Sequence, residues 1–371
     1  MAPPSFDLRS DTVTRPTAAM RAAMAAAPTG DDAWGDDALV ASLEARVAAL
    51  LGKPAGLWLP TGTLANQLAL SLQSRRHTTV ACNPGAHLQV HEDASAAALA
   101  GVQVMPLGSR WGYDAQMLEA LLDEERCGWP ELAVVWLENT LGEGGGVLWP
   151  LHDDAARPGV SSLRTLGQLA HAHGKAVHLD GARLWNAHVA TGTPMSSFGA
   201  VADTVAVCLS KGLGAPAGSV LCGERELLVR ARRLKHAYGG AMRQAPAMLA
   251  AAGHHALDHH VARLADDHRR AARLAAAIAD LPHWEVVPPQ TNLVLARVRP
   301  PLRFAEWLCA PLRAAGVLCF PNIAREVRLA VHLDLDDAAI DEVVARIRTT
   351  LGDDPERFVP RAGAAGTGLT S

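Results

Sequence analysis

Residues 176–183 read AVHLDGAR, a largely apolar run that ends in Asp180 and Arg183. Its apolar residues do not alternate with polar ones, which is typical of a strand covered on both faces of a sheet. Residues 204–209 read TVAVCL, a second run of this kind, which Ser210 and Lys211 follow. The sequence therefore predicts two buried strands whose carboxyl ends carry an acidic and a basic side chain.

Five further apolar runs surround these two, and stretches with helical spacing of apolar residues separate most of them. The runs are Leu57–Pro60, Thr79–Cys82, Val102–Leu107, Leu132–Glu138 and Ser219–Cys222, and the helical patterns cover 37–50, 63–73, 114–122 and 163–173. Strands that alternate with helices predict an α/β fold built on a large, mostly parallel sheet.

The pattern changes after residue 224. Residues 224–281 are almost wholly helical in pattern, and short strand candidates and two more helices follow them. These are the strands 284–287, 292–298 and 328–331 and the helices 304–315 and 336–349. We therefore expect four parts: an N-terminal arm (1–19), a large α/β domain (20–250), a smaller C-terminal α+β domain (251–351) and a disordered tail (352–371).

Bulk composition excludes several classes of protein. The 371 residues carry a formal net charge of −4, which gives no electrostatic case for nucleic acid or an anionic membrane as partner. We find no secretory signal and no apolar stretch of spanning length, and none of the six cysteines forms a Cys-x-x-Cys pair, so we expect a cytoplasmic protein with reduced thiols. We expect no metal site, because His255 and His259, one turn apart, lack the rest of a zinc motif.

Asp180 and Lys211 together predict chemistry with pyridoxal phosphate (PLP). Ligands of open α/β sheets bind at the carboxyl ends of the strands. A lysine amine there can form an imine with the PLP aldehyde, and a carboxylate can keep the ring nitrogen protonated. The turn at 60–63, PTGT, opens a helix and could hold the phosphate. Each feature has a structural alternative: a helix cap for Asp180, a surface turn for Lys211 and a capped helix for the turn.

The chain resembles the threonine aldolase family of fold-type I PLP enzymes in motifs that run in family order from about residue 6 to 350. The matching segments are DLRSDTVTRP (7–16), GDD (35–37), PTGT (60–63), HLDGAR (178–183), LSKGLG (209–214), MRQ (242–244) and VHLD (331–334). An ordered set of this kind is far more specific than any one segment. The resemblance implies the PLP-dependent transferase-like fold, type I, and homodimers or homotetramers.

The resemblance also implies a role for each matching residue. Lys211 is the Schiff-base lysine, Asp180 pairs with the pyridine nitrogen, and His87 stacks on the cofactor ring. The phosphate is held by Gly62, Thr63 and Arg243, with Arg243 reaching in from a neighbouring subunit. The substrate carboxylate is bound by Ser10, Arg183 and Arg328, because guanidinium groups make paired contacts with carboxylates.

The chain departs from the family pattern on the substrate side. Many members carry a histidine where this chain has Leu141, and a tyrosine where it has Trp34. We interpret both as substrate-binding residues that favour a bulkier or more apolar β-substituent. The base that takes the β-hydroxyl proton stays open: His87, an ordered water, the cofactor phosphate, Glu92 and His91 are all candidates.

The expected function is that of a PLP-dependent aldolase. It would cleave L-threonine, L-allo-threonine or a bulkier L-β-hydroxy-α-amino acid to glycine and an aldehyde by breaking the Cα–Cβ bond. Two alternatives remain, namely a PLP-dependent β-eliminating lyase and a PLP-binding protein without turnover. Arg183 and Arg328 count against the second, because they serve no purpose without an amino-acid substrate.

Overall fold

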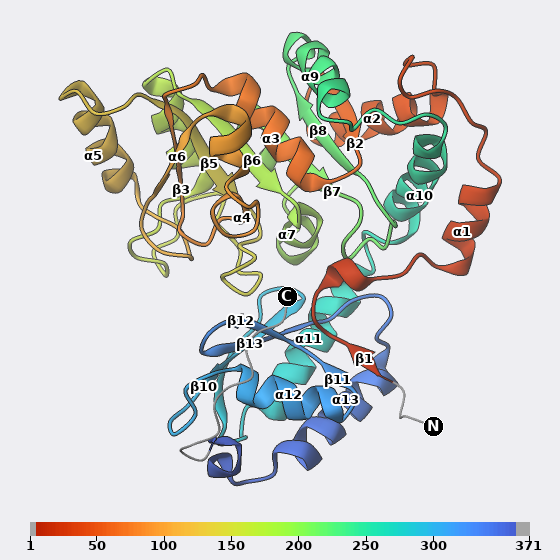
Figure 1. Cartoon of the computed structure of the whole chain (residues 1–371), viewed down its shortest axis with the longest axis vertical. Helices are drawn as coiled ribbons and strands as arrows, with labels where there is room; N and C mark the ends of the chain where they lie inside the picture. The colour runs from red at the N-terminus through yellow and green to blue at the C-terminus, as the bar shows by residue number, and fades with distance from the viewer. Residues whose placement is uncertain (1–4, 361–371) are drawn as a thin grey trace. The chain divides into compact units, whose positions relative to one another are not determined.

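The structure, a computed structural model, describes residues 5–360 and divides the chain into two compact units (Figure 1). The larger unit comprises residues 14–267, and the smaller unit comprises residues 1–13 together with 268–371. This division differs from the predicted one at both ends of the large domain. The larger unit begins at residue 14 instead of 20 and ends at residue 267 instead of 250, and residues 1–13 of the predicted N-terminal arm belong to the smaller unit.

A seven-stranded sheet forms the centre of the larger unit. Its strand order is β2-β8-β7-β6-β5-β3-β4, and every pair is parallel except the two that involve β8. The strands are β2 (Ala55–Leu59), β3 (Thr79–Cys82), β4 (Gln103–Pro106), β5 (Leu132–Glu138), β6 (Ala176–Gly181), β7 (Thr204–Cys208) and β8 (Ser219–Gly223). The sequence predicted all seven, and the mostly parallel α/β fold is confirmed.

Helices on the two sides of this sheet make it a three-layer structure (Figure 1). The helices of the larger unit are α1 (Ala18–Ala25), α2 (Ala38–Leu50), α3 (Gly62–Gln73), α4 (His87–Val90), η2 (Ala96–Ala100), α5 (Ala115–Arg126), α6 (Leu163–Ala172), α7 (Leu184–Thr191), α8 (Met195–Gly199), α9 (Arg225–Ala237) and α10 (Ala245–His259). Capping side chains set where several begin. Asp37 accepts hydrogen bonds from the backbone N–H groups of Leu39 and Val40, and Thr17 caps α1 in the same way.

Strand β2 shows why its sequence is apolar at every position. Leu57, Trp58 and Leu59 are all fully buried, but alternate residues enter different cores. Leu57 and Leu59 pack with α3 and α9 on one face, and Trp58 packs with α2 on the other. Edge strand β4 is the exception, because its four residues are only half-buried or exposed.

Helix α10 explains why the larger unit extends beyond residue 250. Ala250, Ala252 and Ala256 share a core with Leu43 of α2, and a Cβ on Gly253 would lie 2.8 Å from Leu43 Cδ2. Such close packing fixes α10 to the larger unit. The next helix, α11 (Leu264–Ile278), begins there and continues into the smaller unit.

The smaller unit is built around a four-stranded antiparallel sheet of order β12-β13-β10-β9. Its other strands, β1 and β11, form a parallel pair, and Leu8 just after β1 is fully buried in the core of this unit. The elements are β1 (Phe6–Asp7), η1 (Asp11–Val13), β9 (Trp284–Val287), β10 (Leu293–Val298), α12 (Glu306–Ala314), β11 (Val317–Leu318), β12 (Phe320–Ile323), β13 (Glu326–Ala330), α13 (Asp337–Leu351) and η3 (Pro355–Phe358). The α+β prediction is confirmed.

Two terminal segments differ from expectation. The arm predicted for residues 1–19 contains a strand, a 3-10 helix and the start of α1, and residues 1–4 lie outside the described part. Part of the predicted disordered tail, residues 355–358, forms η3, whereas residues 361–371 lie outside the described part. Between residues 5 and 360, no helix combines the length and the apolar character that a bilayer span requires.

We predict that Gly167→Ala destabilises the larger unit. Alanine normally favours a helix interior over glycine by about 1 kcal/mol. At this position in α6, however, a Cβ would lie 2.7 Å from the carbonyl oxygen of Val201. We expect the free energy of unfolding to fall by about 1–3 kcal/mol. Chemical denaturation measures it, with the exposed neighbour Gln168→Ala as control, which should change it by less than about 0.5 kcal/mol. An increase in stability for Gly167→Ala would contradict this packing.

Candidate active site

The carboxyl ends of three adjacent parallel strands bring together the predicted catalytic residues. Strand β5 ends at Glu138, which pairs with Asp180 in β6, and Asp180 pairs with Ala206 in β7. Lys211 follows the end of β7 by three residues and is half-buried. The register therefore delivers Asp180 and Lys211 to the same edge of the sheet, as the sequence predicted.

The amino end of α3 lies at this same edge. Strand β8 runs antiparallel to both β2 and β7, so β2 and β7 point the same way. A Cβ on Gly62 would lie 2.8 Å from Cys208 Sγ, so only glycine fits there without a shift. Thr61 caps the helix, because its Oγ1 accepts a hydrogen bond from Leu64 N at 3.1 Å. Gly62 and Thr63 thus occupy the first turn, where backbone N–H groups and the helix dipole favour an anion.

Asp180 is a buried carboxylate held by two donors. Its Oδ1 accepts from Ala182 N at 3.0 Å, and its Oδ2 accepts from Asn66 Nδ2 at 2.8 Å. Burial raises the pKa of Asp180, but the charges of His87 and Lys211 and the bond from Asn66 outweigh it and hold the pKa below its ordinary value. The carboxylate is therefore ionised at neutral pH and can stabilise a cation beside it.

His87 is joined to Asp180 through a buried amide and a second carboxylate. Its Nδ1 lies 2.8 Å from Glu92 Oε1, and Glu92 also accepts from Asn66 and Gln67. Burial lowers the pKa of His87, but Glu92 and Asp180 raise it above its ordinary value. One ligand atom each of His87, Glu92 and Asp180 lies within 4.8 Å of the others, a spacing that suits a cation, but side-chain amides already donate to both carboxylates. We interpret the group as a hydrogen-bonded network.

Glu138 forms a second acidic centre at the edge. Its two oxygens accept from the backbone N–H groups of His87 and Gly142, both at 2.8 Å. Burial and the neighbouring charge of Asp180 raise the pKa of Glu138 to about 7. A Cβ on Gly142 would lie 3.4 Å from both Arg183 Nη1 and Glu138 Oε1, so Arg183 reaches this centre. Leu141, the residue before, is buried and pairs with Val147 across the loop.

Two predicted substrate residues belong to the smaller unit. Arg328 in β13 donates from Nη2 to the carbonyl oxygen of Arg9 at 3.3 Å, and from Nη1 to Asn322 Oδ1 at 3.3 Å. Its guanidinium also lies over the ring of Phe320. Ser10 follows Arg9 directly, so the structure brings Ser10 and Arg328 to the same part of this unit.

Comparison with known proteins identifies the family. A model of the beta-eliminating lyase family matches residues 7–300. The chain is 36% identical over 348 residues to the low specificity L-threonine aldolase of Escherichia coli K12, covering 93% of this chain and 99% of that one. It is 34% identical over 349 residues to a probable low-specificity L-threonine aldolase of Arabidopsis thaliana, covering 92% and 96%. The chain belongs to the threonine aldolase and beta-eliminating lyase family.

This family consists of PLP-dependent lyases, so the protein is a lyase, and the predicted resemblance is confirmed. The fold agrees. A solved structure of Leishmania major threonine aldolase superposes with a TM-score of 0.77 and 18% sequence identity, covering 94% of this chain and all of that one. At that identity the likeness concerns the fold alone.

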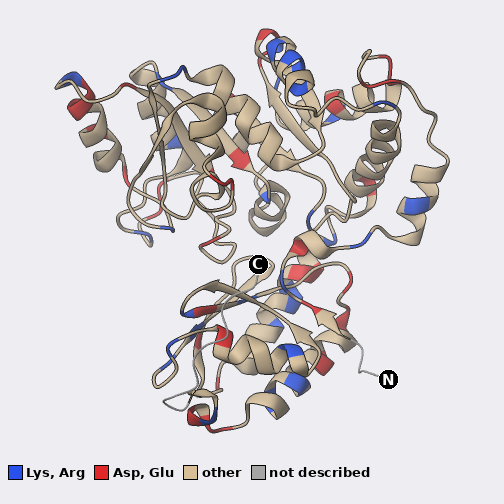
Figure 2. Cartoon of the chain, viewed as in Figure 1, with Lys and Arg blue, Asp and Glu red and all other residues tan. Residues whose placement is uncertain are grey.

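Arg243 and Trp34 lie apart from the enclosed residues of this family site. Their side chains are highly exposed: 76% for Arg243 and 82% for the whole of Trp34. An ion pair of 3.6 Å joins Arg243 to Asp31. Asp32, the residue after Asp31, forms a buried ion pair of 2.7 Å with Lys235 of α9, and both side chains are 1% exposed. Asp32 also accepts a hydrogen bond from Met242 N, so this ion pair fixes the segments that carry Trp34 and Arg243. Figure 2 shows the charged residues of α9.

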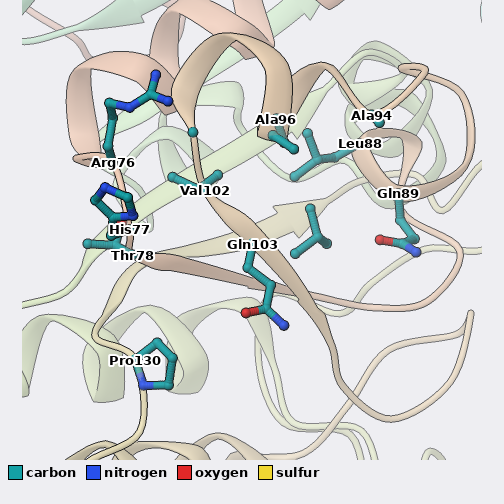
Figure 3. A pocket seen from close by; sticks show the side chains of 13 residues that line it. Arg76, His77, Thr78, Leu88, Gln89, Ala94, Ala96, Val102, Gln103 and Pro130 are labelled. Carbon is teal, nitrogen blue, oxygen red and sulfur yellow. The ribbon is translucent and has the colours of Figure 1, made fainter.

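A hollow of about 780 Å³ lies beyond edge strand β4 (Figure 3). Its wall includes Arg76, His77, Gln103 and Pro130, together with Leu88 and Gln89 of α4. None of the predicted site residues lines it. The hollow is therefore separate from the predicted site.

Sequence reasoning assigned no role to Asn66 or Gln67, which organise the buried carboxylates. A signal was present, because they are adjacent polar residues in an otherwise apolar stretch of α3. They lie one turn after Thr63, where helical spacing directs them toward the same side. His178 was also missed; its Nε2 lies 3.2 Å from Asn66 Oδ1, and burial lowers its pKa to about 4, so it is neutral and keeps Asn66 oriented.

We predict that Lys235→Met strongly destabilises the protein. It would leave the Asp32 carboxylate buried without its cation, a change that costs about 3–5 kcal/mol. Denaturant unfolding at fixed protein concentration measures this loss. The exposed pair of Arg126 and Asp123 supplies the control, since Arg126→Gln should cost less than about 1 kcal/mol. Equal losses in the two variants would show that burial of the Lys235 pair carries no special energy.

Proposed function

We propose that this protein cleaves L-β-hydroxy-α-amino acids to glycine and an aldehyde, with PLP bound at Lys211. The observation that carries the proposal is the arrival of Asp180 and Lys211 at one sheet edge in a member of this family. Relatives from Escherichia coli and Arabidopsis thaliana bear the name low-specificity L-threonine aldolase. L-Threonine, L-allo-threonine or a bulkier analogue is the proposed substrate.

The donors at the sheet edge fit PLP. The ionised, buried carboxylate of Asp180 matches a protonated ring nitrogen, and the amine of Lys211 matches the aldehyde. Gly62 and Thr63 offer the amino end of α3 to the phosphate, and Cys208 leaves no room there for a larger side chain. His87, fixed by Glu92, supports one face of the ring. When bound, PLP supplies the electron sink for breaking a bond at Cα.

Three residues are proposed to hold the substrate carboxylate. They are Arg183, Arg328 and Ser10, the residues to which the resemblance to the threonine aldolase family assigns this role. By fixing the carboxylate, these residues would orient the substrate and so select which bond at Cα is broken. Because Leu141 is buried and apolar, we propose that substrates with a large or apolar β-substituent are preferred over threonine.

We further propose that the protein works as a homodimer or homotetramer. Arg243 and Trp34 are exposed, although the resemblance assigns both to the active site. Their exposure is explained if both residues contribute to the active site of a second copy, where Arg243 binds the phosphate of PLP. The buried pair of Lys235 and Asp32 would then hold Arg243 in place for its neighbour.

Lys211→Ala tests the function. The wild type should show the visible absorbance band of covalently bound PLP and release glycine from L-threonine, L-allo-threonine or β-phenylserine. The variant should lose the band and lower kcat/KM by at least about 10³-fold, since the covalent link is lost. Glycine and aldehyde are quantified directly. Ammonia and a 2-oxo acid in place of glycine (2-oxobutyrate from either threonine, phenylpyruvate from β-phenylserine) would instead establish a β-eliminating lyase, and a band without any product would establish a PLP-binding protein.

Gly62→Ala tests the phosphate site. Its Cβ would displace Cys208 or the first turn of α3, so we expect the affinity for PLP to fall by about tenfold, equivalent to about 1.4 kcal/mol. Titration of the apoprotein with PLP measures the dissociation constant. In the double variant Gly62→Ala/Cys208→Ala the sulfur is absent, and most of the affinity should return. No loss in the single variant would place the phosphate elsewhere.

A further inference from the structure

A second imidazole beside the site is held by a carboxylate of its own. His91 directly follows α4, and its Nε2 lies 2.8 Å from Glu143 Oε1. The side chain of Glu143 is only 6% exposed, whereas that of His91 is 38% exposed. Because a carboxylate accepts, Nε2–H of His91 donates to it, and the lone pair of the neutral ring lies on Nδ1. This is the arrangement by which a carboxylate orients a histidine base.

The pair lies on the side where the chain carries Leu141. The centroid of the His91 ring lies 5.4 Å from that of His87. Glu143 stands two residues after Leu141 in the loop that follows β5, and Gly142 between them borders Arg183. The ring of His91 thus neighbours the ring of His87, which is proposed to support the cofactor. Leu141 itself has no atom that can accept a proton.

The carboxylates at this edge are already engaged. Glu92 accepts hydrogen bonds from Asn66, Gln67 and His87. Glu138 accepts one backbone N–H on each oxygen. Each oxygen of the two carboxylates therefore already faces a donor. In His91, as in His87, a carboxylate faces one ring nitrogen and leaves the other available, and His87 is the group proposed to support the cofactor ring.

We propose that His91, oriented by Glu143, is the base that accepts the proton of the substrate's β-hydroxyl. This inference rests on the proposed aldolase function. As the O–H proton moves to His91 Nδ1, the O–H electron pair becomes the second bond of the aldehyde carbonyl. The Cα–Cβ bond breaks and its electron pair stays with Cα, which takes up a proton to give glycine. The proton on His91 is returned to solvent, so no other reactant is needed.

The variant His91→Gln tests whether His91 acts as the base for the β-hydroxyl. The amide of glutamine can still donate to Glu143, but it cannot take a proton. We expect kcat for cleavage of β-phenylserine to fall by about 10²–10⁴-fold, the usual contribution of a general base. Glycine has no β-hydroxyl, so exchange of its α-proton in D₂O, followed by NMR, should change by less than about threefold. The dissociation constant of PLP, measured by titrating the apoprotein, should also be unchanged.

His171→Gln is the matched control. His171 also faces a carboxylate, with Nε2 3.0 Å from Asp203 Oδ2, but Asp203 precedes β7 and so lies at the opposite edge of the sheet. This variant should leave cleavage, exchange and PLP affinity unchanged. A fall in cleavage as large as that of His91→Gln would show that the loss is not specific to the site.

Glu143→Gln tests the orientation of His91. A carboxylate can only accept from the ring, whereas an amide can also donate to it, so this variant no longer holds the N–H of His91 on Nε2. We expect kcat for cleavage of β-phenylserine to fall while exchange of the glycine α-proton stays unchanged. Cleavage at the wild-type rate would overturn the pairing.

The outcomes distinguish a failure of the role proposed for His91 from a failure of the proposed aldolase function. Cleavage by His91→Gln within about threefold of wild type would overturn the role of His91 and leave the aldolase function intact. An equal loss of cleavage and of glycine exchange would also overturn it, since a base for the β-hydroxyl has no part in exchange. Glycine exchange by the wild type without cleavage of any β-hydroxy amino acid would overturn the proposed function itself.

Discussion

The burial of Asp180 without loss of its charge is the constraint on which the site depends. A buried carboxylate is stable only when donors and positive charges surround it. Asn66 supplies a donor to Asp180 and another to Glu92, and His178 holds Asn66 in the correct orientation. Helix α3 therefore does more than cover the sheet. Its polar face fixes the acids that the chemistry requires, and its amino end presents the turn at Gly62.

The sequence was informative wherever a function or an element depends on neighbours along the chain. Seven strands followed from runs of buried apolar residues, and Asp180 and Lys211 followed from their positions at strand ends. The direction of β8 did not, because an antiparallel strand buried on both faces has the same composition as a parallel one. Gly62 lies beside Cys208 because β2 and β7, on either side of β8, point the same way.

Interactions between distant residues could not be predicted in the same way. The ion pair of Lys235 with Asp32 joins positions about two hundred residues apart, and neither position carries a local signal of burial. His91 was one of several possible bases in the sequence. Only the structure joins it to Glu143, and only the structure shows that Glu92 is engaged by three donors.

The burial of Leu8 in the smaller unit has a consequence for synthesis on the ribosome. The strand β1 pairs with residues 317–318, so its partner emerges late in synthesis. Residues 14–267 can fold as soon as they leave the exit tunnel, because domains generally fold as units in the order of translation. The N-terminal segment can bury Leu8 only after residues 317–318 and the rest of the smaller unit have been made.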